Sequence, residues 1–275
     1  MKQKIKVATN RKPTADIATE FVLQIPRPSG FCVEFGAWDG RHLLNSFALL
    51  NQFNYAGVLI EPNKKKFQNL CENYRNKRNV QCLNRMVGWS KADSLDKILS
   101  GSACPKRFDF LSIDVDGNDW HIWEAIRIYK PQVVCVEFNP TILAGVEFVQ
   151  PADGKIQWGC SVASLLKLGK KKGYKPLFIG MHDVVFGSAD FGRRTQVFAS
   201  LLKQENSSHQ LTSHIFIGYD GRILLRGYKN LRWHGMRFYE EDLQVLPRFL
   251  QKLPDSMNLS QKMFLRLFLL LRRWT

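Results

Sequence analysis

The apolar positions of this chain fall into short continuous runs that are separated by segments in which apolar residues recur with helical spacing. The apolar runs predict strands at about 31–35, 56–60, 80–83, 107–114 and 131–138, with a final strand pair at 175–180 and 184–186. The periodic segments predict helices at 15–25, 43–53, 63–76, 94–99, 120–129 and 161–172. Strands alternating with helices indicate a doubly wound α/β fold, whose mostly parallel sheet is covered on both faces and has room for an antiparallel edge.

The alternation stops near Ser188, where a different organisation begins. Residues 214–219 and 222–227 predict a hairpin with Asp220-Gly221 at its turn. The aromatic and basic stretch 231–247 could either cover a pocket or serve packing. We therefore expect a lead-in helix in residues 1–29, a catalytic domain in 30–187 and an extension in 188–275.

The last segment of the extension, residues 263–274, predicts a basic amphipathic helix. It is shorter than the ~20 apolar residues that a bilayer crossing requires, so we expect no transmembrane segment. Docking on the protein itself is the favoured interpretation, because apolar helix faces usually belong to a core. Pairing with another chain and peripheral contact with a membrane remain open.

Length and composition narrow these expectations. A chain of 275 residues suits one α/β domain with an extension. Its net charge of +16 favours anionic partners, among which acidic small molecules or glycans, nucleic acid and lipid headgroups all remain open. The six cysteines form no Cys-x-x-Cys pair, which argues against structural zinc. The basic N-terminus lacks the apolar core of a secretory signal, so we expect a cytoplasmic protein.

The first strand ends in the pattern Glu34-x-Gly36-x-x-x-Gly40, and the second ends in Glu61-Pro62. Glycines at such a turn let a ligand and the next helix approach the backbone, and an acid after the second strand suits ribose hydroxyls. A dinucleotide turn has a further glycine where this chain has Trp38, so pyrophosphate fits poorly. A nucleoside cofactor without phosphate is favoured, although glycines that serve packing alone would give the same pattern.

A second acidic group follows the fourth strand in the sequence Asp114-Val-Asp116-Gly-Asn-Asp119. With Val33 to Gly40 and Ile60-Glu-Pro62, this run resembles the FkbM-like family of class I S-adenosylmethionine (SAM)-dependent methyltransferases, over residues 30–190. The resemblance implies a Rossmann-like, seven-stranded sheet and methylation at an oxygen of a sugar, polyketide or related natural product. The chain departs from the commoner family pattern at Trp38-Asp39 and at Asp116, where glutamate is frequent.

For SAM, Gly36 and Gly40 are expected to admit the methionine part and the ribose, and Glu61 to accept hydrogen bonds from the ribose hydroxyls. Glu34 is expected to orient the loop or the amino group of the cofactor, and Asp114 to pair with its ammonium group. The loop after the third strand is expected to approach adenine. The residues predicted to bind SAM are Glu34, Gly36, Ala37, Trp38, Gly40, Glu61, Arg85, Met86 and Asp114.

Methyl transfer to a hydroxyl requires an in-line acceptor oxygen and a group that takes its proton. The candidates for this base are Asp116, Asp119, Glu137 and His182, the last because its usual pKa lies near neutrality. An alternative places Mg²⁺ on Asp114, Glu137 and Asn139, at the ends of adjacent strands. A polar turn at a strand end would also explain Glu137 and Asn139.

Two other functions stay open. The basic surface, with Tyr174 and Trp233 as stacking platforms, would suit an RNA methyltransferase, and Asn139-Pro140 weakly resembles the motif of nucleic-acid amine methyltransferases. The chain could also be a catalytically silent binding module, because a fold does not guarantee its chemistry.

Overall fold

The computed structural model describes residues 13–192 and 211–272, which fall into two compact units divided between Ser207 and Ser208. The expected boundary between 187 and 188 falls within a strand that ends at Ser188, and the expected division into three parts stays a prediction. Residues 1–12 of the expected lead-in segment and 193–210 of the expected extension are outside the described residues.

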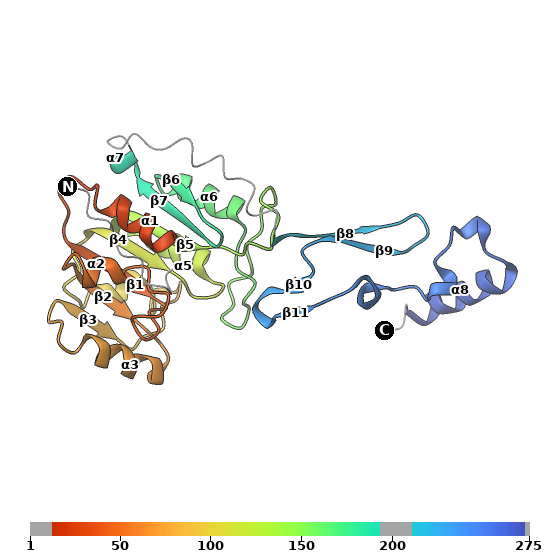
Figure 1. Ribbon diagram of the computed structural model, residues 1–275, viewed down its shortest axis with the longest axis horizontal. Helices are drawn as coiled ribbons and strands as arrows, with labels where there is room; N and C mark the ends of the chain where they lie inside the picture. The colour runs from red at the N-terminus through yellow and green to blue at the C-terminus, as the bar shows by residue number, and fades with distance from the viewer. Residues whose placement is uncertain (1–12, 193–210, 273–275) are drawn as a thin grey trace. The chain divides into compact units, whose positions relative to one another are not determined.

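The first unit is built on a seven-stranded sheet with the order β3-β2-β1-β4-β5-β7-β6 (Figure 1). The strands are β1 (Phe31–Phe35), β2 (Ala56–Ile60), β3 (Val80–Leu83), β4 (Arg107–Ile113), β5 (Lys130–Glu137), β6 (Tyr174–Ile179) and β7 (Asp183–Ser188). Neighbouring strands from β3 to β5 are parallel, whereas β7 runs antiparallel to β5 and β6. The predicted parallel sheet and its antiparallel edge are thus confirmed.

Helices cover both faces of this sheet. They are α1 (Pro13–Val22), α2 (Phe47–Asn51), α3 (Lys64–Tyr74), α4 (Leu95–Leu99), α5 (Asp119–Ala125), α6 (Val162–Lys171) and α7 (Ala189–Gly192). One buried apolar cluster joins α4, α5 and α6 to residues such as Val33 and Val134, and the other joins α1, α2 and α3 to residues such as Cys32 and Leu59. Alternate residues of a strand point to opposite faces, so the continuous apolar runs of the sequence supply both cores.

A carboxylate on α4 sets the end of α5. Asp96 accepts hydrogen bonds from the main-chain N–H groups of Arg127, Ile128 and Tyr129, at 2.7, 3.0 and 3.2 Å. These groups would otherwise continue α5, which ends at Ala125 rather than at the predicted residue 129. The sequence pattern located the helix, but a carboxylate from another element ends it.

β1 lies next to β4, where the strand order reverses and the loops after the two strands run in opposite directions. In open α/β sheets this switch point, at the carboxyl ends of the strands, is where ligands bind. The acids of the two sequence motifs, Glu61 after β2 and Asp114 after β4, flank it.

The second unit is small, and its described part consists of short strands, 3₁₀ turns and one α-helix. It contains the hairpin β8 (Ser213–Ile217) and β9 (Ile223–Gly227), the short pair β10 (Asn230–Leu231) and β11 (Met236–Arg237), the 3₁₀ turns η3 (Arg232–His234), η4 (Glu240–Leu243), η5 (Arg248–Leu250) and η6 (Pro254–Ser256), and α8 (Leu259–Arg272). The hairpin matches the one predicted from Asp220-Gly221. Among the described residues, no helix combines the length and apolarity needed to cross a membrane.

Gly36 is the position of the first unit that tolerates a side chain least. Its φ is +76°, and a Cβ there would lie 1.9 Å from the main-chain oxygen of Asp114. The left-handed φ alone costs a non-glycine residue ~1–2 kcal/mol, and the clash with a backbone atom adds to it. We predict that Gly36→Ala lowers the free energy of unfolding by ~3 kcal/mol or more in urea titrations.

Gly154 is the matched control, because a Cβ there would meet no atom within 4 Å and its φ is not in the left-handed region. Gly154→Ala should change stability by less than ~0.5 kcal/mol. Equal stability of the two variants would contradict the close approach of β1 and β4 at Gly36.

Candidate functional site

The turn after β1 is organised around the buried carboxylate of Glu34. Its two oxygens accept hydrogen bonds from the main-chain N–H groups of Asn45 and Ser46, at 2.9 and 2.7 Å. Glu34 is 3% exposed, and burial raises the pKa of its carboxyl to about 7. Of the two roles considered for Glu34, these contacts favour orientation of the loop. They also explain why α2 begins only at Phe47 and not near residue 43.

Glu61 connects the turn after β1 to the end of β2. One carboxylate oxygen accepts the N–H of Trp38 at 2.9 Å, and the other accepts the N–H of Asn63 at 2.8 Å. The residue is 4% exposed. A carboxylate oxygen can accept two hydrogen bonds, so each oxygen retains one further acceptor position beside the turn. Glu61 therefore lies where a ribose-binding acid is expected, and it also holds the turn.

Packing within the protein explains why both positions of the first motif are glycine. At Gly36 a side chain would meet β4, as described above. At Gly40 a Cβ would lie 2.5 Å from the ring of Tyr74 and 2.6 Å from Leu70, both on α3. The missing side chain of Gly40 therefore makes room for α3, and its expected role in admitting the cofactor stays a prediction. The buried Ala37 donates its N–H to Ile60 O, which also closes the turn on β2.

Trp38 occupies the turn position where a dinucleotide fold has glycine. Its φ of +50° lies in the left-handed region, which costs a tryptophan free energy. The Glu61 bond to its N–H holds this conformation. The ring is 47% exposed, and the ammonium of Lys66 lies 3.6 Å from the ring centroid. The turn thus presents an aromatic face and a cation next to the acid of β2.

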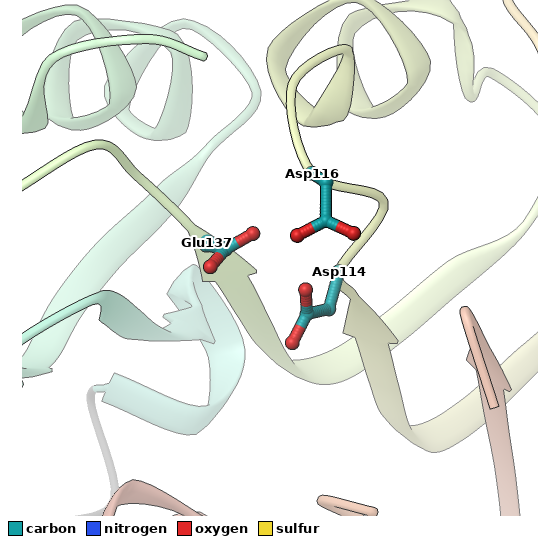
Figure 2. A group of neighbouring side chains, drawn as sticks. All are labelled: Asp114, Asp116 and Glu137. Carbon is teal, nitrogen blue, oxygen red and sulfur yellow. The ribbon is translucent and has the colours of Figure 1, made fainter. Parts of the chain in front are cut away.

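Three carboxylates meet at the carboxyl ends of β4 and β5. Asp114 follows β4, Asp116 lies two residues on with a left-handed φ of +56°, and Glu137 is the last residue of β5. One oxygen of each lies within 4.8 Å of the others, and Figure 2 shows the side chains converging. Asp116 is exposed and the other two are half-buried. Like charges this close repel each other, so a proton or a cation would stabilise the group.

Asp119 does not share this position, although it was a candidate base. It is 2% exposed, and its oxygens accept the N–H groups of Val115 and Gly117 at 2.9 and 3.0 Å. Burial, and next the charge of Asp114, raise the pKa of its carboxyl to about 7. These contacts shape the loop that carries Asp116. We therefore regard Asp119 as a positioning residue.

The amide of Asn139 is also used within the protein. Its nitrogen donates to Trp158 O at 2.8 Å, and its oxygen accepts from the N–H and hydroxyl of Thr141 at 2.9 and 2.7 Å. These bonds occupy the oxygen of Asn139 that the expected Mg²⁺ site would use, whereas an oxygen of Asp116 lies within 4.8 Å of one from Asp114 and one from Glu137. The Mg²⁺ site itself stays a prediction. The bonds of Asn139 also leave no amide free to act as in the amine methyltransferase motif.

The segment between β5 and α6 contains a buried glutamine for which the sequence analysis predicted no role. Gln150 is 1% exposed and donates its side-chain N–H groups to Asn118 Oδ1 and Ile156 O, while its side-chain oxygen accepts the N–H groups of Trp158 and Gly159. It thereby fixes this long loop to the loop after β4. A glutamine in a loop gives no sequence signal for such a function.

The remaining predicted residues have less defined roles. Arg85 and Met86 are exposed after β3 and line a hollow of about 600 Å³ with Lys97 and Gly101 of the α4 region. His182 is half-buried beside the Glu137 and Asp183 pair, and its carbonyl accepts the N–H of Phe138. The side chain of Tyr174 is buried and its hydroxyl donates to Pro131 O, so it cannot stack on a base as the RNA interpretation required.

Comparison with known proteins gives likenesses in structure alone. No family model and no curated protein matches the chain. The N-terminal domain of EvdMO1 with SAH bound shares 15% identity, with 63% of this chain and 80% of that chain covered and a TM-score of 0.42. For TrmK of M. capricolum in complex with SAH the identity is 9%, the coverage 62% and 67%, and the TM-score 0.38. For the O-methyltransferase from Bacillus cereus in complex with SAH the identity is 22%, the coverage 45% and 56%, and the TM-score 0.33.

The sheet itself identifies the fold. The order β3-β2-β1-β4-β5-β7-β6 with β7 antiparallel is the Rossmann-like arrangement of class I SAM-dependent methyltransferases. The chain has this fold. Membership of the FkbM-like family rests on the sequence motifs alone and stays a prediction.

The raised pKa of Glu34 predicts how stability depends on pH. The ordinary value for glutamate is ~4.3, so between about pH 4.5 and about 7 the folded protein holds a proton that the unfolded chain has lost. The free energy of unfolding should therefore fall as pH rises through this range, by up to ~1.4 kcal/mol per unit, with a further contribution of the same sign from Asp119.

Urea titrations at several pH values test this, with Glu34→Gln compared to wild type. The variant should show a shallower fall, whereas the exposed control Glu20→Gln should follow the wild type. A wild-type stability that rises between pH 5 and 7 would contradict the assignment.

Proposed function

We propose that the protein is a SAM-dependent methyltransferase that methylates a hydroxyl oxygen of a sugar, glycan or related natural product. The observation that carries the proposal is the position of Glu61. A methyltransferase fold brings its carboxylate to the N–H of Trp38 at the switch-point side of the sheet, with acceptor capacity left on both oxygens. Ribose hydroxyls are donors that this acid would hold.

Asn45 gives a second point of fit for the cofactor. Its side-chain nitrogen donates to the hydroxyl of Ser112 on β4, at 2.9 Å, whereas its buried Oδ1 has no hydrogen-bond partner. A buried acceptor without a donor costs ~1–3 kcal/mol. The ammonium group of SAM is a donor of the required kind, and Asp114, two residues beyond Ser112, would supply the opposing charge.

SAM supplies an electrophilic methyl group, so the remaining requirement is a group that takes the proton of the acceptor hydroxyl. Asp116 and Glu137 are the residues we propose for this role, because they are accessible and lie at the strand ends beside the expected cofactor. His182 stays a further candidate.

Oxygen as the methyl acceptor is favoured over RNA amines by the occupied amide of Asn139. An anionic acceptor would be drawn by the net charge of +16. A divalent cation on Asp114, Asp116 and Glu137 is the alternative to direct proton transfer, since three oxygen ligands within 4.8 Å suit Mg²⁺.

Isothermal titration with SAM tests the proposal. The wild type should bind SAM, and Glu61→Gln should weaken binding about tenfold or more, because one acceptor oxygen is replaced by a donor. Glu72→Gln, an exposed acid on α3, is the control and should leave the affinity unchanged. Thermal unfolding of each variant shows that it is folded. A folded wild type that does not bind SAM would favour the silent binding module instead.

Incubation of the protein with labelled SAM and fractionated cell extract provides a transfer assay that distinguishes a base from a metal. Asp116→Asn should lower transfer about 100-fold while SAM affinity stays within about twofold, because general-base help contributes ~10²–10⁴-fold. Dialysis against EDTA should leave wild-type transfer intact. Loss of transfer on dialysis and its recovery with Mg²⁺ would assign the three acids to a metal site.

A further inference from the structure

The helix α8 of the second unit has one face packed against its own unit. The ring of Phe264 lies 5.1 Å from that of Phe249, and the side chain of Gln261 donates to Phe249 O at 2.9 Å. Leu265 and Phe268 lie one helical turn after Gln261 and Phe264, on the same side of α8, and are half-buried. These contacts fix which side of α8 faces η5 and the residues around it.

The opposite face of α8 is apolar as well. Helical spacing at 100° per residue places on that side the four residues Leu259, Met263, Leu267 and Leu270, which we call the open face of α8. Their side chains are between 54% and 76% exposed. Most soluble helices have one apolar face and one polar face, so a helix that packs through one side and exposes four large apolar residues on the other suits a second partner.

The charges around the open face show which partner it suits. Lys262 and Arg266 lie along one edge of the open face and are exposed. In the sequence, Asp255 is the last acidic residue, and Lys262, Arg266, Arg272 and Arg273 follow it. An apolar stripe flanked by cations and without acids complements a surface of apolar chains beneath anionic headgroups. A protein groove would need no such one-sided charge.

We propose that the open face of α8 binds the surface of an anionic lipid bilayer, with the helix lying parallel to the membrane plane. Leu259, Met263, Leu267 and Leu270 enter the boundary between headgroups and acyl chains, and Lys262 and Arg266 contact lipid phosphates. The 14 residues of α8 are too few to cross the bilayer, which agrees with an interfacial position. The binding is independent of the proposed methyl transfer.

Flotation of the full-length protein with lipid vesicles tests the proposal. Vesicles of phosphatidylcholine with about one third phosphatidylglycerol should carry the protein upward, whereas pure phosphatidylcholine should carry at least fivefold less. The bound fraction should fall in 0.5 M salt, because the Debye length then drops to a few ångströms and the basic residues lose their attraction for the headgroups.

Two variants separate the open face from a general effect of charge. Leu267→Glu places a charge in the middle of the open face and should lower the bound fraction at least fivefold. Leu253→Glu adds the same charge at an apolar residue that is 55% exposed, in the same unit but outside α8, and should bind like the wild type. Circular dichroism of both variants, together with SAM titration of the first unit, confirms that each is folded.

Three outcomes would overturn the proposal. The first is that the wild type fails to float with anionic vesicles. The second is equal flotation of wild type and Leu267→Glu. The third is a dimer in light scattering that Leu267→Glu dissociates while vesicles bind neither form, which would assign the open face to a second copy of the chain.

Discussion

Two buried carboxylates, Glu34 and Glu61, determine the shape of the turn after β1. Together they accept four main-chain N–H groups, from Trp38, Asn45, Ser46 and Asn63. Buried N–H groups outside helices and sheets need such acceptors, because an unpaired one costs about as much as a lost hydrogen bond. The turn is therefore a fixed irregular loop at the switch point of the sheet, and the proposed site depends on it.

The strands could be predicted from the sequence, whereas the loops and helix ends that depend on buried carboxylates could not. The seven strands follow from their apolar runs. For the central parallel strands β1, β2, β4 and β5 the reason is that a strand buried on both faces needs a nearly continuous apolar sequence. Helix ends were predicted less well, since Glu34 and Asp96 take N–H groups that would otherwise extend α2 and α5. Such contacts join residues far apart in the chain, and no local pattern reveals them.

The site shows the same limit. The sequence pattern predicted that Asp114 and Glu137 lie at the same edge of the sheet. In the structure the two residues are close to each other and to Asp116. The sequence could not show that Gly40 faces Tyr74 or that the amide of Asn139 is used by its own loop, because both depend on tertiary packing. The same sequence motifs contain polar residues that hold loops together and polar residues that are accessible to a substrate. The two kinds can be told apart only from their hydrogen bonds in the structure.

The resulting arrangement divides the proposed work between two sides of the switch point. The turn after β1 and the end of β2 would hold the cofactor, and the ends of β4 and β5 would meet the acceptor. Asp119 and Gln150 are not proposed to contact the cofactor or the acceptor. Their side chains instead hold the loops that follow β4 and β5 through hydrogen bonds. Because the fold alone does not establish the reaction, the account depends on where a nucleoside would lie.

A crystal structure of the protein with S-adenosylhomocysteine tests this most directly. The account predicts a ribose hydroxyl within about 3 Å of a Glu61 oxygen, next to Trp38. A nucleoside bound at any other place, with the Glu61 carboxylate meeting main-chain N–H groups alone, would contradict it.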